Sequence, residues 1–462
     1  MFLFLPVILI GYFWLLHKRL VLGSKVWLVG GSLFFYGYWN IIYIPLLLVS
    51  IFVNFSVGSA MSDVPQEQRK AKLLKTFSSK QLLWFGIFFN IGLLAYFKYT
   101  DFFLTNFNGI FGSNIPLLHI ILPLGISFFT FTQIAFLVDA YKREVKEYDL
   151  LHYMLFVTYF PHLLAGPILH HKEMMPQFAN KWNFAIRWKN VASGLFLFSI
   201  GLFKKVIIAD FFADYANYFY ADTINLDMLQ AWAASFTYTL QLYFDFSGYT
   251  DMAIGVSLLF NIKLPINFNS PYKATSIQDF WRRWHMTLSR FLRDYIYIPL
   301  GGNRHGGVRT SLNLMATFII GGIWHGAGWT YVFWGFLHGV ALVINHVWKS
   351  LGLKLPMLLA WFLTFNFVNI AWVFFRAPTW DDATTVVTMM FSWSEFEWDD
   401  IYDSSVYWQV IVGILLTLVL KNSNEWTKTQ KATLKYELFT ALLLIIGIVS
   451  LSKVSEFIYF QF

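Results

Sequence analysis

Apolar runs close to the length of a membrane-spanning helix recur along the whole of this chain, which restricts its fold more than any other feature. Spanning a bilayer takes about 20 predominantly apolar residues. Of the 462 residues, 57% are hydrophobic and only 13% are charged, whereas about 25% of residues are charged in soluble domains. The pattern predicts an all-α polytopic membrane protein and excludes a soluble enzyme, a secreted disulfide scaffold and a disordered chain. The absence of cysteine excludes thiolate nucleophiles and cysteine metal sites.

The first half of the chain divides into five predicted spans. They cover residues 2–16, 25–39, 41–60, 81–97 and 120–138. The first has no basic residues before it and no small-residue cleavage site after it, so we expect it to stay attached as a membrane segment. About ten crossings, forming one transmembrane domain over residues 1–462, are expected for the whole chain.

Charges between the apolar runs predict the orientation. Basic residues collect in segments 17–25, 62–80, 139–149, 263–310 and 421–435, whereas segments 210–228 and 379–403 are acidic and segment 98–119 is nearly free of basic residues. Basic loops lie on the cytoplasmic side. Both termini are therefore expected on the outer side of the membrane, and the net charge of +8 reflects topology and not nucleic-acid binding.

Three segments do not fit a simple span. Residues 151–165 are short, contain Pro161 and have basic flanks, so we predict a re-entrant segment. Residues 229–261 are expected to be interrupted between Asp245 and Asp251, and residues 311–348 to be broken at the Trp-His-Gly sequence around His325. Broken helices persist in membranes only where protein or a water-filled cavity satisfies their backbone. The middle of the chain is therefore expected to surround a cavity.

His325 is the strongest candidate for catalysis. It follows an apolar stretch, is surrounded by glycines and is flanked by Trp324 and Trp329. Ionisable residues at membrane depth are costly and are functional candidates by default. A neutral imidazole in such a place can act as a general base. The alternative is a buried histidine that only joins two helices by a hydrogen bond.

His285 lies in the sequence Trp-Arg-Arg-Trp-His, for which we predict an amphipathic helix at the inner interface. In that helix Trp281, Trp284, His285 and Leu288 would share one face. The basic side could bind an anionic cytoplasmic group such as the phosphates of coenzyme A. The alternative for its arginines is topogenic charge alone. We expect the helix to end at Pro299. The candidates for binding such a cytoplasmic group or lining the expected cavity are Trp281, Arg282, Arg283, Trp284, Asp245, Asp251, Trp324 and Asn303.

Asp245 and Asp251 have two possible roles. They could orient a catalytic histidine, or they could form ion pairs with neighbouring arginines. Neither a serine-centred elbow nor a His-Glu-x-x-His motif occurs. His170 and His171 lack further ligands at metal spacing, so no metal is expected. What remains is a base without a protein nucleophile, which favours direct acyl transfer to an acceptor hydroxyl.

At these residues the sequence resembles the membrane-bound O-acyltransferase family, in its bacterial branch of alginate and peptidoglycan O-acetylation subunits. The matching stretches are residues 159–168, 243–252, 281–294, 297–304, 322–329 and 334–339, and residues 459–462 look similar too. The resemblance implies a helical disc with a central tunnel and assigns functional roles to His325 and His285. It also implies acetyl-CoA as donor, a polysaccharide acceptor and an SGNH-type partner outside the membrane.

Three rival functions remain open at this point. Within the same family, a D-alanyl transfer protein would take its acyl group from a carrier-protein thioester. A non-enzymatic transporter would hold its substrate at broken helices but is expected to show inverted repeats, which the sequence lacks. A glycosyltransferase needs a carboxylate pair in an outer loop, and the early outer loop offers only Asp101.

Overall fold

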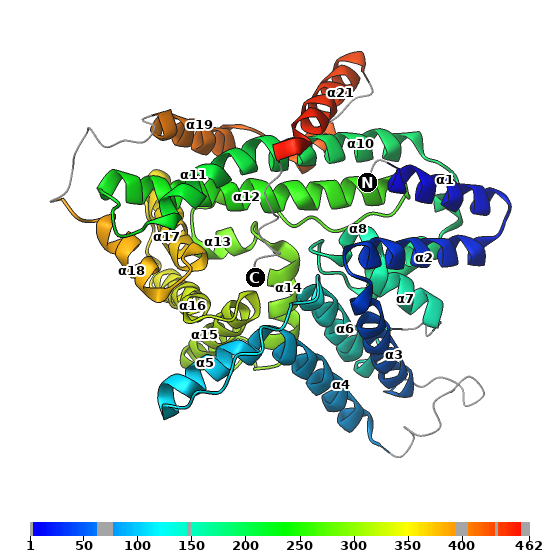
Figure 1. Cartoon of the computed structure of the whole chain (residues 1–462), viewed down its shortest axis with the longest axis horizontal. Coiled ribbons are helices and arrows are strands. Elements are labelled where there is room, and N and C mark those ends of the chain that lie inside the picture. Colours follow the sequence, from blue (N-terminus) through cyan, green and yellow to red (C-terminus); the bar gives the residue numbers. More distant parts are fainter. Residues whose placement is uncertain (1–2, 62–76, 146–148, 394–404, 430–432, 454–462) are drawn as a thin grey trace. The chain divides into compact units, whose positions relative to one another are not determined.

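The computed structural model describes residues 3–61, 77–145, 149–393, 405–429 and 433–453, and all regular structure in these ranges is helical (Figure 1). The all-α prediction is therefore confirmed for the described residues. Contacts divide the chain into two compact units. Unit 1 comprises Met1–Leu195 and Ala253–Pro265, and unit 2 comprises Phe196–Met252 and Ile266–Phe462. The expected single domain over the whole chain stays a prediction.

Unit 1 is built from the N-terminal helices. Its elements are α1 (Phe4–His17), α2 (Val21–Trp39), η1 (Ile41–Tyr43), α3 (Ile44–Met61), α4 (Ser79–Leu94), η4 (Ala95–Tyr99), α5 (Thr100–Phe111), α6 (Ile126–Tyr141), α7 (Leu150–Thr158), α8 (Phe160–Leu163), α9 (His171–Ala179) and η5 (Lys181–Asn183). Buried amides join its apolar helices. Asn54 of α3 and Asn90 of α4 donate to one another at 3.2 and 2.6 Å, as expected where lipid offers no competing partner.

Unit 2 carries the candidate site. Its elements are η6 (Lys204–Ala209), α11 (Asp210–Ala221), η7 (Pro271–Lys273), α13 (Ile277–Trp281), α14 (Met286–Leu292), η8 (Arg293–Tyr297), α15 (Gly306–His325), α16 (Trp329–Ser350), α17 (Met357–Arg376), α18 (Trp380–Met389), α19 (Ser405–Val419), α20 (Ser423–Thr429), α21 (Leu434–Val449) and η9 (Ser450–Lys453). Helices α10 (Trp188–Phe203) and α12 (Met228–Leu259) contribute residues to both units.

Among the described residues, five helical stretches are long and apolar enough to cross a membrane. They are Ile41–Met61, Ser79–Phe111, Trp188–Ala221, Trp329–Ser350 and Met357–Arg376. Three shorter apolar helices are Phe4–His17, Ile126–Tyr141 and Ser405–Val419. These helices make the chain an integral membrane protein. The predicted spans 2–16, 25–39 and 41–60 match α1, α2 and η1 with α3, whereas the count of ten crossings stays a prediction.

Residues 98–119 were predicted to form a loop after the span 81–97, but the first part of this segment is helical. Helical structure continues without a gap from Ser79 to Phe111, past Lys98, and the chain leaves the helix only at Gly112 in the left-handed region, φ 62°. The Asp101 carboxylate accepts the backbone N–H groups of Leu118 and His119 at 2.8 and 2.9 Å. The charged residues therefore did not mark the end of the helix, because the returning backbone satisfies the carboxylate. The next helix, α6, begins at Ile126, later than the predicted span 120–138.

The predicted interruption of residues 229–261 is also wrong. Helix α12 runs through Asp245 and Asp251 as 32 continuous residues. A Cβ at Gly248 would lie 2.7 Å from the carbonyl oxygen of Gly201, and one at Gly201 would lie 2.6 Å from that of Gly248. These glycines allow close backbone approach to the stretch before η6, which brings lysines to the two carboxylates. Neutralised in this way, the carboxylates need no break in the helix.

The other two segments are irregular in the structure too, although a re-entrant path for residues 151–165 stays a prediction. Residues 151–165 form two short helices, α7 and α8, separated at Tyr159, and the nine residues of α7 rise only roughly 14 Å. The break near His325 is present between α15 and α16. Residues 62–76, 146–148, 394–403, 430–432 and 459–462, which belong to the charged segments and the motifs described above, lie outside the described residues.

Candidate active site

His325 is the last residue of α15, at the tip of a tight helical hairpin. The chain turns through three residues, Gly326 to Gly328, and returns as α16. A Cβ at Gly326 would collide with the ring of Tyr331, and one at Gly335 would collide with the carbonyl oxygen of Phe318. Glycine at these positions therefore lets α15 and α16 pack backbone against backbone and fixes the end of α15.

Aromatic rings enclose the His325 imidazole. The ring centroids of Trp324, Trp334 and Phe375 lie 4.9, 5.1 and 5.1 Å from its own. The residue is 4% exposed. The helices that supply these rings are α15, α16 and α17, so neighbouring elements of the chain build the enclosure. A setting of this kind excludes water and strengthens hydrogen bonds formed to a substrate.

His285 lies beside His325 and comes from a break that the sequence did not predict. Helix α13 ends at Trp281, and α14 begins only at Met286, with His285 as its N-cap residue in the left-handed region, φ 40°. The expected continuous amphipathic helix is therefore wrong. Trp281, Trp284, His285 and Leu288 are nevertheless all buried, because the turn directs them inward without helical periodicity. The helical structure ends at Tyr297, close to the expected Pro299.

The two imidazoles form the centre of the candidate site. Their ring centroids are 6.4 Å apart, and Trp324 lies 6.3 Å from His285 and 4.9 Å from His325. His285 is fully buried, and burial lowers its pKa to about 3. It is therefore neutral near pH 7. Two imidazoles at this separation are too far apart for a direct hydrogen bond, but a small reacting group placed between them could contact both.

The two tryptophans of the Trp-Arg-Arg-Trp-His sequence pack inside the unit. The indole N–H of Trp281 donates to Nδ1 of His338 at 3.2 Å. Trp284 stacks on Phe280 and lies 5.0 Å from Trp372, measured between ring centroids. Both residues therefore belong to the aromatic core of the unit, in which the ring centroids of Trp281 and Trp334 lie 5.8 Å apart. Trp324, in contrast, contacts both imidazoles directly.

The candidate donor-binding side chains on the basic segment are not gathered around the histidines. Arg282 and Asn303 are exposed. The Arg283 guanidinium pairs with Asp279 one turn earlier, at 3.0 Å to each carboxylate oxygen, and its side chain is 33% exposed. Asn303 lies in a turn beside Gly302, whose φ is 57°. These residues occupy accessible positions, where a large anionic ligand could reach them.

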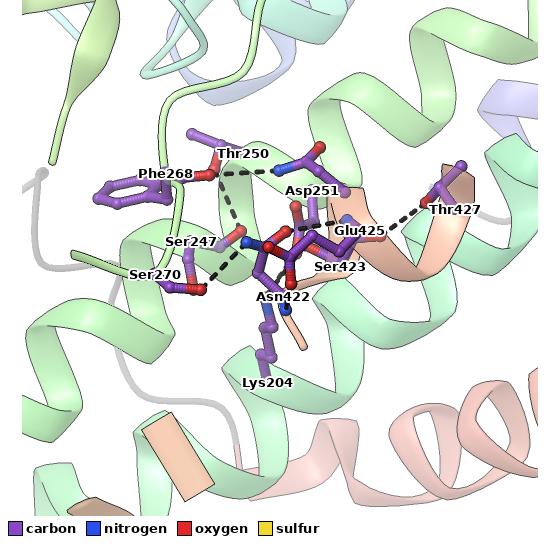
Figure 2. A network of polar contacts seen from close by, with 11 residues as sticks. Lys204, Ser247, Thr250, Asp251, Phe268, Ser270, Asn422, Ser423, Glu425 and Thr427 are labelled. Atoms are coloured by element: carbon purple, nitrogen blue, oxygen red, sulfur yellow. Dashed lines mark hydrogen bonds and ion pairs between the residues drawn. The ribbon is translucent and has the colours of Figure 1, made fainter. Parts of the chain in front are cut away.

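Asp245 and Asp251 form ion pairs with lysines. The Lys204 ammonium lies 2.7 Å from Asp251, and the Lys205 ammonium lies 2.8 Å from Asp245 and 2.6 Å from Asp210. Each of these five side chains is at most 11% exposed. Figure 2 shows Lys204 and Asp251 within a larger polar network that also contains Ser270, Asn422 and Glu425. The geometry gives these aspartates an ion-pairing role within the fold.

The sequence analysis missed three features of this unit. His338 is fully buried on α16, one turn after Trp334, with ring centroids 4.7 Å apart. Asn267 contacts His285 through its side chain. The lysine pair of η6 neutralises the aspartates. Only His338 carried a signal, since it lies in the 334–339 motif; the other contacts join residues that are distant in sequence.

His170 and His171 are buried in unit 1, in the loop before α9 and at its first residue. His170 Nδ1 lies 3.7 Å from the carboxylate of Asp139. Within the described ranges, no three or more histidine, aspartate or glutamate side chains form a group that could hold a metal ion.

Comparison with known proteins agrees with this architecture. The profile described as MBOAT, membrane-bound O-acyltransferase family, matches residues 32–377, a range that includes both histidines. The chain belongs to the membrane-bound O-acyltransferase family, and it is an enzyme of the acyltransferase class.

Several curated proteins are similar to the chain. A protein of Helicobacter pylori named peptidoglycan O-acetyltransferase is 45% identical, over 100% of this chain and 96% of its own length. A probable alginate O-acetylase of Azotobacter vinelandii is 36% identical, over 91% of this chain and 82% of its own length. A teichoic acid D-alanyltransferase of Streptococcus thermophilus is 29% identical over 54% of this chain and 68% of its own length. The acetylating relatives therefore match more of the chain.

Proposed function

We propose that this enzyme transfers acetyl groups from acetyl-CoA, on the cytoplasmic side of the bacterial inner membrane, toward a cell-wall or exported polysaccharide outside. The observation that carries the proposal is the pair of buried imidazoles, whose ring centroids are 6.4 Å apart. The whole of this chain also aligns with a peptidoglycan O-acetyltransferase. Peptidoglycan is the favoured final acceptor, and an alginate-like polysaccharide is the second candidate.

The chemistry we propose is direct transfer. His325 accepts the proton of an acceptor hydroxyl while the hydroxyl oxygen attacks the thioester carbonyl carbon. The carbon–sulfur bond breaks, an oxygen ester forms, and the proton returns to the leaving thiolate. The enclosure of His325 by Trp324, Trp334 and Phe375 supports this role, because water that could hydrolyse the thioester is kept out. His285 is the second imidazole of the pair, with its ring centroid 6.4 Å from that of His325.

The transmembrane arrangement is part of the proposal. Basic segment 263–310 would present arginines to coenzyme A on the inner side, while both termini face outward. Moving only the acetyl group through a central tunnel avoids carrying the phosphates of coenzyme A across lipid. The immediate acceptor is expected to be a hydroxyl of an SGNH-type partner protein outside the membrane, which then acetylates the polysaccharide.

The test uses inverted membrane vesicles, acetyl-labelled coenzyme A and a lumenal acceptor, comparing the wild type with His325→Ala. We expect label to reach the lumenal acceptor in the wild type and transfer to fall by about 10²- to 10⁴-fold in the variant, the range lost with a general base. His346→Ala is the matched control, because His346 lies on α16 but is exposed, and it should transfer at the wild-type rate.

Two outcomes would overturn parts of the proposal. Transfer by His325→Ala at the wild-type rate would remove the catalytic role of this histidine. A wild type that ignores acetyl-CoA but uses a D-alanyl carrier-protein thioester would favour the alternative function suggested by the D-alanyltransferase relative.

A further inference from the structure

Asn267 lies directly against the histidine break and is 1% exposed. Its side-chain oxygen accepts the backbone N–H of Thr287 at 3.1 Å and the Thr287 hydroxyl at 2.8 Å, and it lies 3.3 Å from Nδ1 of His285. A backbone N–H can only donate. The atom of the amide that faces it is therefore the carbonyl oxygen, which fixes the orientation of the Asn267 side chain.

This orientation has a consequence for His285. An amide oxygen only accepts hydrogen bonds, so the nitrogen that faces it, Nδ1, must carry the proton. In the neutral imidazole the lone pair then lies on Nε2. The low pKa of His285, caused by burial, agrees with a neutral ring near pH 7. Nε2 is thus the atom of His285 that can accept a proton or a hydrogen bond.

Backbone contacts hold Asn267 in place. The N–H of Met286 donates to the carbonyl oxygen of Asn267 at 3.0 Å, and the N–H of Asn269 donates to that of Arg283 at 2.9 Å. These two bonds pair the segment around Asn267 with the turn that carries His285. The amide and the imidazole are therefore positioned by the same short stretch of backbone.

A second set of contacts fixes this segment from the other side. The Asn422 amide donates to the side-chain oxygens of Asn269 and Ser270, both at 3.0 Å. Asn424 donates to the carbonyl oxygen of Phe268 at 3.2 Å. Figure 2 shows Asn422 directed at Ser270. The residues on both sides of Asn267 are thus tied down, which leaves little freedom to the amide that faces His285.

The contacts of Asn267 use only one end of its amide. The Nδ2 group of Asn267 is buried and has no hydrogen-bond partner among the described residues. An unmet buried donor destabilises the folded state. A purely apolar residue of similar size would avoid that penalty, although it would also lose the three contacts of the side-chain oxygen.

We propose that Asn267 is the positioning residue of His285: it sets the Nδ1–H tautomer and the ring orientation, so that Nε2 faces the reacting group during acyl transfer. The proposal rests on the proposed function for its link to catalysis. Asn267 acts through His285 and does not itself touch the substrate. A residue that fixes the tautomer of a functional histidine affects the reactivity of that histidine without contacting the substrate.

The first test is independent of activity. The enzyme, labelled with ¹⁵N in histidine and purified in detergent, is examined by NMR, with His285→Asn used to assign the His285 signals. We expect the Nδ1–H tautomer for His285 in the wild type and its loss in Asn267→Leu. A wild-type His285 protonated on Nε2 would overturn the proposal, whatever the acyl donor proves to be.

The second test measures turnover in proteoliposomes. We expect Asn267→Leu to lower kcat by about 10- to 100-fold, as for other residues that orient a functional histidine, with the KM for the donor within about twofold. Asn267→Asp keeps the acceptor oxygen and should recover part of the rate. The carboxylate of this variant favours the imidazolium form of His285. As the pH is lowered, activity should therefore begin to fall at a higher pH than in the wild type. His325 is the titratable ring that faces His285 and is unchanged in every variant.

Thr287→Val is the matched control. It removes the hydroxyl that shares the same Asn267 oxygen but leaves the contact with His285, and we expect kcat within about twofold of the wild type. An Asn267→Leu protein that elutes as a folded monodisperse species and turns over at the wild-type rate would overturn the proposal. If the wild type does not use acetyl-CoA, the proposed function fails, and the same variants are compared with the thioester that the wild type does use.

Discussion

Two buried polar regions of unit 2 differ in what surrounds them. The lysine–aspartate cluster, formed by Lys204, Lys205, Asp210, Asp245 and Asp251, places each ammonium 2.6–2.8 Å from a carboxylate. The histidine pocket, formed by His285, His325, Trp324, Trp334 and Phe375, surrounds two imidazoles with aromatic rings. Both regions bury polar groups among apolar helices. The first matches charge with charge, whereas the second packs imidazoles against uncharged aromatic rings.

The difference teaches that a polar residue in an apolar helix is not by itself a functional signal. In the cluster the partners account for the burial, and the expected consequence of a substitution is lost stability. In the histidine pocket the surroundings favour reactivity, and the expected consequence is lost turnover. Stability and turnover measured on the same variants can therefore separate the two regions.

The largest effect on stability is expected from Lys205→Met. The substitution leaves the buried carboxylates of Asp210 and Asp245 without this cation, and breaking a buried pair from one side costs about 3–5 kcal/mol. Detergent-purified protein should melt at a markedly lower temperature by fluorescence-detected size-exclusion chromatography. The double variant Lys205→Met with Asp245→Asn should recover part of the loss, because it removes one of the stranded charges.

The matched variant in the histidine pocket is His325→Phe, which should lose turnover while keeping a wild-type melting temperature. A Lys205→Met protein as stable as the wild type would contradict the structural role assigned to the cluster. A His325→Phe protein with a much lower melting temperature than the wild type would contradict the catalytic role assigned to His325.

A smaller effect is expected from Gly335→Ala, which tests the shape of the histidine pocket. The added Cβ would meet the carbonyl oxygen of Phe318 and approach Gly322 Cα at 3.2 Å. Backbone must therefore shift, at a cost of about 1–3 kcal/mol. We expect a lower melting temperature together with reduced turnover, since α15 carries His325.

Gly307→Ala is the control for this substitution. It lies on α15 as well, but an added Cβ there meets nothing within 4 Å. Alanine is the better helix former, so the control should match or slightly exceed the wild type in stability. Equal effects of the two substitutions would show that the close approach of α15 and α16 does not constrain the site.

The smallest effect on stability is expected at the exposed arginines. Arg282→Glu should leave the melting temperature unchanged while raising the KM for acetyl-CoA, because it places a negative charge where the donor phosphates are expected. Arg283→Gln loses an ion pair that is about one-third exposed, which is worth less than about 1 kcal/mol. An unchanged KM in Arg282→Glu would leave these arginines with a topogenic role only.

The sequence predicted the helical class, the positions of the N-terminal helices and the break at His325, because apolar runs and glycine clusters are local signals. It did not predict the path of α12 through Asp245 and Asp251. The lysines that neutralise these carboxylates lie about forty residues earlier in the chain, and only the fold brings them together.

The candidate site was predicted in the same uneven way. His325 and His285 were identified, and the structure brings their rings close to one another. The left-handed conformation of His285 and its contact with Asn267 depend on tertiary pairing with a separate segment. The helical periodicity over residues 280–288 therefore predicted correctly which side chains are buried. It predicted wrongly that the backbone is one continuous helix.

The close packing of α15 against α16 has a consequence for how the protein is made. Among the described helices, α16 is apolar enough to enter a bilayer by itself, whereas α15 is absent from the stretches that meet this criterion. Glycines let the two backbones touch at Gly322 and Gly335. We expect the pair to leave the translocon together, as one hairpin, with α16 carrying its less apolar neighbour into the lipid. The catalytic candidate His325 would then reach its place only after the helix that follows it has been synthesised.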